Sequence, residues 1–234
     1  MPLFNGKSYL ELSKLEAYSR LAIELELRTL ANDGIILYNG QTASGKGDYV
    51  SLAIKDGHVE FKYNLGSGEI LLRSSQKLQI GRFHRIIAKR YQRDGMLSVD
   101  GRDETTGHSK GPKNFLDLGE HLYLGYVPGS VQQIFDNIGV SVGFNGCIRH
   151  FKIGRQYIDL KYPGGKILKA VNTSRTPVKW GVVVCAAHNG AIMWGPQCLT
   201  ICRGGRFQLQ PVRQLLGRGI SSVIILVSSS PCPF

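Results

Sequence analysis

Short stretches in which apolar and polar side chains alternate dominate residues 1–160 of the chain. In the clearest of them, Ile23, Leu25 and Leu27 alternate with charged residues. A period of two predicts a β-strand, even though the Leu, Glu, Ala and Lys content of this stretch favours a helix by propensity. We expect helical structure only as a short turn before the strand, near Lys14–Tyr18.

Turn-forming residues separate further apolar or alternating runs along the chain. Roughly a dozen short strands without a long helix indicate an all-β, antiparallel sandwich and make a parallel α/β architecture unlikely. The other strands we expect are Ser8–Leu12, Gly34–Gly40, Glu69–Ser74, Arg82–Gln92, Met96–Gly101, His121–Val127 and a last hairpin over Cys147–Leu160.

The stretch Gly47–Gly68 gives the most detailed prediction. Asp56-Gly57 suits a two-residue type I′ turn, which closes a β-hairpin. Counting outward from this turn pairs Asp48 with Leu65 at the open end of the hairpin. The same register places six apolar side chains on one face: Val50, Leu52, Ile54, Val59, Phe61 and Tyr63.

The open end of this hairpin is the sharpest candidate site in the chain. We expect the Asp48 carboxylate beside the backbone carbonyl of Leu65, and oxygen atoms of these two kinds are ligands that Ca²⁺ prefers. From the hairpin alone a simpler alternative stays open, in which Asp48 is a solvated turn residue of a glycine-rich loop.

The chain changes in character near residue 172. Its 234 residues include 29 Lys and Arg and 17 Asp and Glu, a net charge of +12, which indicates polyanionic partners. Residues 173–234 contain six of the basic residues and no acidic one, which leaves 23 basic against 17 acidic residues before them. We therefore expect one domain over residues 1–172 and a divergent, poorly structured basic tail over residues 173–234.

Two classes of partner are not expected. The apolar run at residues 223–227 is far too short to span a bilayer, and the first residues do not form a secretory leader, so we expect no membrane insertion. No aromatic stacking platform is interleaved with the basic residues, so we expect no nucleic acid partner either.

Six segments in order resemble a known family: FNGKSYLEL, IELELRTLANDGIILYNG, GDYVSLAIKDGHVEFKYNLGSG, GRFHRIIAKRYQRDGMLSVDG, LDLGEHLYLGYVP and GFNGCIRHFKIGRQYIDL. They look like successive parts of a laminin G-like domain of the agrin, perlecan and pikachurin type. The resemblance covers about residues 3–172 of the chain. It implies a jelly-roll sandwich of two curved antiparallel sheets, an extracellular location, and a function in binding.

The same resemblance implies one Ca²⁺ at the rim of the sandwich. The acidic ligands fall on Asp48 and Asp117, and the backbone carbonyl ligands fall on Leu65 and Phe115. The implied partner is an acidic glycan, on a glycosylated receptor such as dystroglycan or as heparan sulfate. Basic candidates for contact with the glycan are Lys46, Arg73, Lys110 and Lys113, and a second basic set lies on the last hairpin at Arg149, Lys152 and Arg155.

The pairing of the cysteines stays open. In the family that the chain resembles, the equivalent of Cys147 forms a disulfide near the end of the domain, and Cys185 is the candidate partner here. The resemblance fades near Asn172, so the simpler hypothesis is an altered terminus that leaves Cys147 unpaired. A zinc site in the tail is the weaker alternative, because the spacing of its four residues is not a standard one: Cys185, His188, Cys198 and Cys202.

Two other functions are kept as alternatives. Glu24 and Glu26 lie about 7 Å apart on one face of the expected strand, within the range of an inverting glycosidase, so a carbohydrate-active enzyme on the same sandwich is a rival. Their simpler interpretation is the solvent face of an amphipathic strand. Heparin binding by the basic surface without a metal is the second rival. We predict a non-catalytic matrix module that recognises acidic glycans through Ca²⁺.

Overall fold

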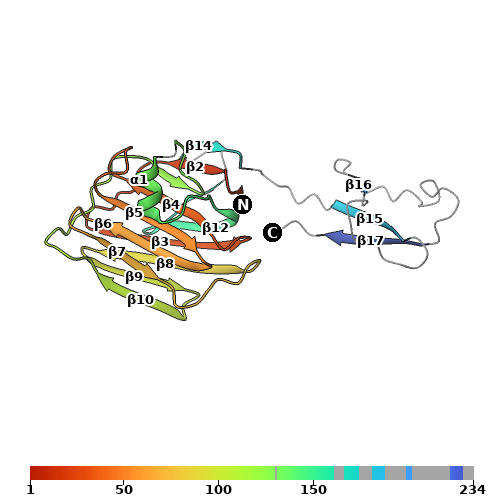
Figure 1. The fold of residues 1–234 in the computed structure, drawn as a ribbon, viewed down its shortest axis with the longest axis horizontal. Helices are drawn as coiled ribbons and strands as arrows, with labels where there is room; N and C mark the ends of the chain where they lie inside the picture. Colours follow the sequence, from red (N-terminus) through yellow and green to blue (C-terminus); the bar gives the residue numbers. More distant parts are fainter. Residues whose placement is uncertain (130, 161–165, 174–180, 188–198, 202–221, 229–234) are drawn as a thin grey trace. The chain divides into compact units, whose positions relative to one another are not determined.

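The computed structural model describes residues 1–129, 131–160, 166–173, 181–187, 199–201 and 222–228 (Figure 1). The chain divides into two compact units, Met1–Thr176 and Pro177–Phe234. The division falls close to the change in composition near residue 172.

The first sheet of the first unit has the strand order β1-β12-β3-β8-β9-β10, with β13 beside β12. All of its pairs are antiparallel. Figure 1 shows β3, β8, β9 and β10 running side by side. The bounds are β1 (Leu3–Asn5), β3 (Arg20–Thr29), β8 (Phe83–Tyr91), β9 (Asp94–Val99), β10 (Asp103–His108), β12 (Asn145–Ile153) and β13 (Gln156–Tyr157).

The second sheet has the order β14-β2-β11-β4-β5-β6-β7 and is also antiparallel. A single short helix, α1 (Gln132–Ile138), lies between β11 and β12 in the described part of this unit. The bounds of the strands are β2 (Tyr9–Leu12), β4 (Gly34–Gly40), β5 (Tyr49–Lys55), β6 (His58–Asn64), β7 (Glu69–Arg73), β11 (Leu122–Leu124) and β14 (Ile167–Val171).

The main core lies between the two sheets and is built from the alternating residues of their strands. In β3 every second side chain is buried, among them Ile23, Leu25 and Leu27. These side chains share one hydrophobic cluster with the apolar face of the β5–β6 hairpin. The all-β sandwich expected from the alternation is therefore confirmed.

The β5–β6 hairpin has the predicted register. Asp56 and Gly57 have φ angles of 52° and 83°, as a type I′ turn requires. The pairs run from Lys55 with His58 to Tyr49 with Asn64. All six side chains expected on one face are buried with no measurable exposure, so the hairpin prediction is confirmed.

A second apolar cluster explains why β4 and β5 are buried on both faces. Helix α1 places Ile134 and Ile138 against a layer that contains Ile35, Tyr38 and Tyr49. The sequence analysis missed this helix, because seven residues give too little of a helical period to be recognised.

Three strands of this unit were not anticipated: β1, β10 and β14. The helical turn expected near Lys14–Tyr18 is absent, so that prediction was wrong. Tertiary contacts hold this stretch in an irregular conformation instead. The Leu15 N–H donates to the buried Asn39 Oδ1 at 2.9 Å, and the carbonyls of Ala17 and Tyr18 accept hydrogen bonds from the buried Arg90 guanidinium.

The described part of the second unit is a three-stranded antiparallel sheet in the order β16-β15-β17. Its strands are β15 (Gly181–Ala187), β16 (Leu199–Ile201) and β17 (Ser222–Ser228). Most of the tail that was predicted to be poorly structured lies outside the described residues. Among the helices of the described residues, none is long and apolar enough to cross a membrane.

Cys147 is fully buried on β12 and is disulfide-bonded. The hypothesis that an altered terminus leaves Cys147 unpaired is therefore wrong. The bonded partner, the candidate Cys185 side chain and the zinc alternative at Cys185, His188, Cys198 and Cys202 lie outside the described side chains.

Candidate metal centre

The structure brings Asp48 and Asp117 together at one end of the sandwich. Asp48 directly precedes β5, and Asp117 lies in the segment between β10 and β11. The Asp117 N–H donates a hydrogen bond of 2.9 Å to Asp48 Oδ2. Leu65 directly follows β6, and the β5–β6 register continued by one pair sets it opposite Asp48. We call this end of the sandwich the rim.

Gln41 links the two acidic residues. Its Nε2 donates to Asp117 Oδ2 at 3.1 Å, and its Oε1 accepts from the Asp48 N–H at 3.1 Å. Gly47 leaves room for this side chain, since a Cβ atom at Gly47 would lie 2.1 Å from Gln41 Oε1. Sequence reasoning missed Gln41, although the pairing of β4 with β5, continued past Gly40 and Tyr49, places it opposite Asp48.

Burial sets the electrostatics of the rim. The Asp48 side chain is almost fully buried, and this loss of solvation raises the pKa of its carboxyl. The hydrogen bond from the Asp117 N–H and the charges of Lys113 and Arg90 oppose the rise, whereas the Asp117 carboxylate adds to it. Protein groups therefore compensate the Asp48 charge incompletely, which favours a cation at this place.

Lys113 lies close to the Asp48 carboxylate. A Cβ atom at Gly66 would lie 2.7 Å from Lys113 Nζ and 2.9 Å from Asp48 Oδ1, so both groups pack against the same glycine. Gly66 has φ +78°, which a residue with a side chain rarely adopts. Among the four glycan candidates, Lys113 is thus placed beside the predicted metal ligands.

The backbone around Phe115 is fixed from two sides. The Leu116 N–H donates to the Tyr18 carbonyl at 2.9 Å. Arg90, which is 2% exposed, donates through its guanidinium to the carbonyls of Tyr18, at 2.9 Å, and Asn114, at 3.3 Å. The Phe115 ring, 47% exposed, stacks on the Tyr18 ring with centroids 4.5 Å apart and an interplanar angle of 8°.

The donor set at the rim suits a hard cation. No group of three or more His, Cys, Asp or Glu side chains that could hold a metal occurs among the described residues. The structure brings the Asp48 carboxylate and Asp117 together at the rim, and the segments that carry the expected carbonyl ligands, Leu65 and Phe115, adjoin them. An all-oxygen set of this kind matches Ca²⁺ better than Zn²⁺, which binds nitrogen and sulfur atoms in structural sites.

Two more of the glycan candidates lie at the same end of the domain. Lys46 belongs to the loop between β4 and β5, where its carbonyl accepts a hydrogen bond from Thr42 Oγ1 at 2.7 Å. Lys110 follows β10, and its carbonyl accepts a hydrogen bond of 3.1 Å from the Oγ of Ser67, which lies in the loop after β6. Both lysine side chains are exposed.

Arg73, the fourth glycan candidate, does not lie at the rim with the three lysines. The pairing of β6 with β7 places Glu69 beside Asn64, near the rim, and Arg73 beside Glu60. Arg73 forms an ion pair with the buried Glu60 and lies 3.6 Å from Asp56 in the hairpin turn. Glu60 is five residues before Leu65, or about 17 Å along an extended strand.

The carboxylates proposed for a glycosidase are neutralised by neighbouring strands. Glu24 Oε1 accepts from Arg85 Nε at 2.9 Å, and Lys152 Nζ lies 3.8 Å from Glu24 Oε2. Glu26 Oε2 accepts from Arg149 Nε at 2.7 Å. Each carboxylate is therefore engaged by basic side chains of neighbouring strands.

Two members of the second basic set, Arg149 and Lys152, contact aromatic rings of the same domain. Arg149 lies over the Phe83 ring with its guanidinium carbon 3.9 Å from the centroid, and Lys152 Nζ lies 5.3 Å from the centroid of Tyr157. Arg155 is exposed at the β12–β13 turn.

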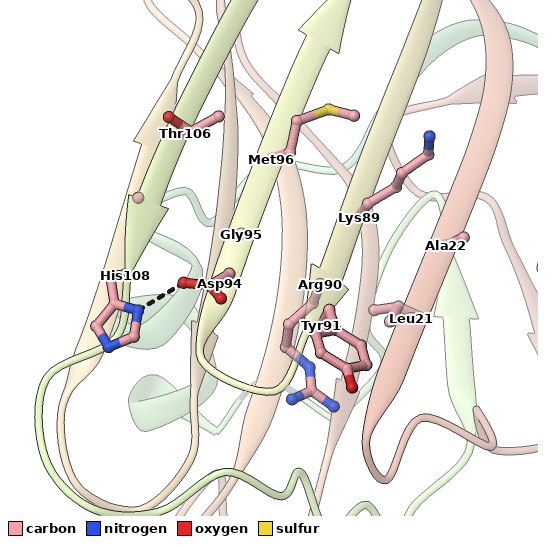
Figure 2. Close-up of a pocket in the computed structure, with 11 residues that line it drawn as sticks. Leu21, Ala22, Lys89, Arg90, Tyr91, Asp94, Gly95, Met96, Thr106 and His108 are labelled. Carbon is pink, nitrogen blue, oxygen red and sulfur yellow. Dashed lines mark hydrogen bonds and ion pairs between the residues drawn. The ribbon is translucent and has the colours of Figure 1, made fainter.

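An open groove of about 640 Å³ crosses β3, β8, β9 and β10 of the first sheet (Figure 2). Figure 2 shows Arg90 and Tyr91 together near the end of β8, and the ion pair between His108 Nδ1 and Asp94 Oδ1, at 2.6 Å, on the neighbouring strands. The groove contains none of the predicted metal or glycan ligands. Arg90 lines this groove and also donates hydrogen bonds to the backbone carbonyls of Tyr18 and Asn114 near the rim.

Comparison with known proteins agrees with this architecture. The Laminin G domain family matches residues 27–159. The "Basement membrane-specific heparan sulfate proteoglycan core protein" of Mus musculus is 39% identical over 156 residues, which are 66% of this chain and 4% of that protein. "Pikachurin" of Homo sapiens is 32% identical over 173 residues, 73% of this chain and 17% of that protein. The chain thus spans less than a fifth of either relative.

Solved structures show the same fold. Mouse laminin alpha1 chain domains LG4-5 match with a TM-score of 0.65 and 24% identity over 80% of this chain and 50% of that one. The LG1-3 region of the laminin alpha2 chain matches with a TM-score of 0.64 and 19% identity over 80% of this chain and 38% of that one. The family match covers more than half of the chain, so this chain belongs to the laminin G domain family.

Proposed function

We propose that this domain recognises an acidic glycan, as carried by a receptor such as dystroglycan, outside the cell and through a bound Ca²⁺ ion. The observation that carries the proposal is the contact between Asp48 and Asp117 at the rim, where burial leaves a carboxylate charge incompletely compensated. Asp48, Asp117 and the carbonyls of Leu65 and Phe115 would hold the ion. Ca²⁺ takes about six to eight oxygen ligands, so positions remain for oxygen atoms of a glycan.

The surroundings of the rim support an anionic ligand. The exposed side chains of Lys46, Lys110 and Lys113 belong to loops at this end of the domain. Lysine ammonium groups form charge-assisted hydrogen bonds with carboxylates and sulfates. An acidic sugar chain held by the ion would therefore meet further positive charge from the protein.

The relatives support a binding role rather than a catalytic one. One relative is, by its name, the core protein of a basement membrane heparan sulfate proteoglycan, which is a matrix component. In this domain Glu24 and Glu26, the pair for which the sequence suggests a glycosidase-like spacing, are engaged by Arg85 and Arg149. We propose that the domain has no catalytic activity of its own.

The test measures the metal first and the glycan second. Calorimetric titration with Ca²⁺ is expected to show saturable binding in the micromolar to millimolar range, and Asp48→Ala is expected to abolish it. Glu26→Gln is the matched control, because it removes a carboxylate charge outside the rim and should leave the Ca²⁺ affinity unchanged. Binding to the glycosylated dystroglycan ectodomain is then measured with Ca²⁺ and with EDTA.

Loss of receptor binding in EDTA and in Asp48→Ala would support the proposal. A wild-type domain that does not bind Ca²⁺ would overturn it. Heparin affinity that is independent of EDTA and falls steeply with salt would then favour the rival, a basic surface that acts without metal.

A further inference from the structure

Tyr18 and Phe115 form an exposed aromatic pair beside the predicted metal ligands. Their side chains are 61% and 47% exposed, and their rings lie parallel at 4.5 Å. Large apolar side chains that stay exposed next to a polar site are typical of recognition surfaces. The residues come from different segments of the chain, so the sequence does not show that they meet.

The segment that carries Phe115 exposes a basic, an aromatic and an acidic side chain to solvent. Leu116 and Leu118 are buried, whereas Lys113, Phe115 and Asp117 are exposed in alternation with buried or half-buried residues. In an extended segment, residues two apart lie about 7 Å apart on one face. An ammonium group, an aromatic ring and a carboxylate therefore follow one another along the solvent side of the rim.

The aromatic pair is held on a rigid support. The Tyr18 carbonyl accepts hydrogen bonds from the Leu116 N–H and from the buried Arg90 guanidinium. The same guanidinium donates to the Asn114 carbonyl, next to Phe115. Because the backbone on both sides is fixed, the two rings are pre-organised before any ligand arrives, which lowers the entropy cost of binding.

We propose that the Tyr18–Phe115 pair is the sugar-stacking part of the glycan site. The apolar face of an acidic pyranose packs on the rings, while its carboxylate reaches the ion held by Asp48 and Asp117 or the ammonium of Lys113. This inference rests on the proposed function and adds the residues that distinguish a sugar ring from a simple anion. A small carboxylate without a ring would gain the ion contact alone.

The experiment compares the two aromatic residues at the rim with an exposed tyrosine elsewhere on the domain. Affinity for the glycosylated dystroglycan ectodomain and for Ca²⁺ is measured for Tyr18→Ala, Phe115→Ala, Tyr18→Phe and Tyr91→Ala. Tyr91 is the matched control, because it is also 61% exposed but lies in the groove of the first sheet. We expect both rim alanine variants to lose about tenfold in receptor affinity, and we expect Tyr18→Ala to do so with unchanged Ca²⁺ affinity. Tyr18→Phe and Tyr91→Ala should bind as the wild type does.

Three results would overturn the inference while the proposed function stands. They are wild-type receptor affinity in both rim alanine variants, an equal loss in Tyr91→Ala, and a loss of Ca²⁺ affinity in Tyr18→Ala that accounts for the weaker receptor binding. A wild-type domain that binds neither Ca²⁺ nor the receptor would instead contradict the proposed function itself.

Discussion

Two pairs of carboxylates in this domain have opposite environments. At the rim, the buried Asp48 carboxylate accepts a hydrogen bond from the Asp117 N–H and lies near the charges of Lys113 and Arg90, but no ion pair among the described residues joins it to an arginine. On β3, Glu24 and Glu26 are only half-buried, and each accepts a hydrogen bond from an arginine of a neighbouring strand. The negative charge of the first pair is therefore incompletely compensated by the protein, whereas that of the second pair is neutralised by arginines.

The comparison shows why the spacing of acidic residues is a poor guide to their role. Glu24 and Glu26 are two residues apart and form an obvious motif in the sequence. Asp48 and Asp117 are 69 residues apart and meet only through the folded chain. An acidic pair is available to a cation only where basic side chains do not already neutralise it. Those basic side chains come from other strands, so the sequence spacing of the pair does not reveal them.

The largest effect that separates the two pairs is on Ca²⁺ affinity. We expect Asp117→Ala to weaken Ca²⁺ binding by at least about 100-fold, since the charge count of the ligands sets the affinity of such sites. Titration calorimetry measures the loss. Glu24→Gln removes one carboxylate from the other pair and should leave the affinity at its wild-type value. If Asp117→Ala binds Ca²⁺ normally, the assignment of the rim is wrong.

A smaller effect of opposite sign is expected at Lys113. Its ammonium lies near Asp48 and competes with a metal ion for the same charge, so Lys113→Gln should raise Ca²⁺ affinity roughly three- to tenfold. Receptor affinity should fall in the same variant, because a contact with the anionic glycan is lost. Lys77→Gln, on the exposed stretch after β7, is the control for removal of one positive charge. Equal effects in both variants would mean that net charge alone is responsible.

The raised pKa of Asp48 makes stability depend on pH. The folded protein without metal binds the Asp48 proton more tightly than the unfolded chain does, since burial disfavours the carboxylate. This contribution is fully present below the pKa of an unfolded aspartate, about 3.9, and is lost as the pH rises through the higher folded value. Thermal melting in EDTA from pH 3 to pH 7 should show the loss in the wild type and not in Asp48→Asn.

Added Ca²⁺ should oppose that loss and stabilise the domain at neutral pH, by about 2.7 kcal/mol at 100 times the dissociation constant. Acidification should release the ion, because a proton and Ca²⁺ compete for the Asp48 carboxylate. A melting temperature that responds to Ca²⁺ equally in the wild type and in Asp48→Asn would contradict this account.

The smallest expected effect concerns stability without metal. Glu26→Gln breaks a partly exposed ion pair with Arg149, and we expect a cost below about 1 kcal/mol in the free energy of unfolding. Asp48→Asn at pH 7 should be neutral or stabilising, since it removes a buried charge but retains an oxygen that accepts from the Asp117 N–H. Urea unfolding in EDTA measures both variants. A large loss in Asp48→Asn would show that its charge is already well compensated.

Local patterns in the sequence predicted the hairpin and most strands of the sandwich. Asp56-Gly57 and the alternating residues beside it determine the β5–β6 register, because turn geometry and burial of one face act over a few residues. The same register placed Leu65 opposite Asp48. Helix α1 was missed, and the stretch Lys14–Tyr18 was assigned a turn of helix that the structure replaces with hydrogen bonds to distant groups.

Errors in the candidate site arose where sequence distance was used in place of strand pairing. Arg73 is eight residues after Leu65, but the pairing of β7 with β6 carries it to the hairpin turn, where it neutralises Glu60. Gln41 was overlooked because the β4–β5 pairing was not continued past Gly40, and its contact with Asp117 joins segments 76 residues apart. Cys147 was judged unpaired from the lack of a family pattern, and the structure contradicts that judgement.

The amino-acid sequence by itself determined most of the strands, the hairpin turn, the change in composition near residue 172 and the likeness to laminin G domains, because each of these depends on neighbouring residues or on motifs in order. Only the tertiary structure decided that Asp48 is buried, that Asp117 and Gln41 contact it, that Tyr18 stacks on Phe115 and that arginines neutralise Glu24 and Glu26. The physical reason is that solvation, ion pairing and stacking depend on groups from separate strands and loops, which the chain brings together only when its two sheets pack.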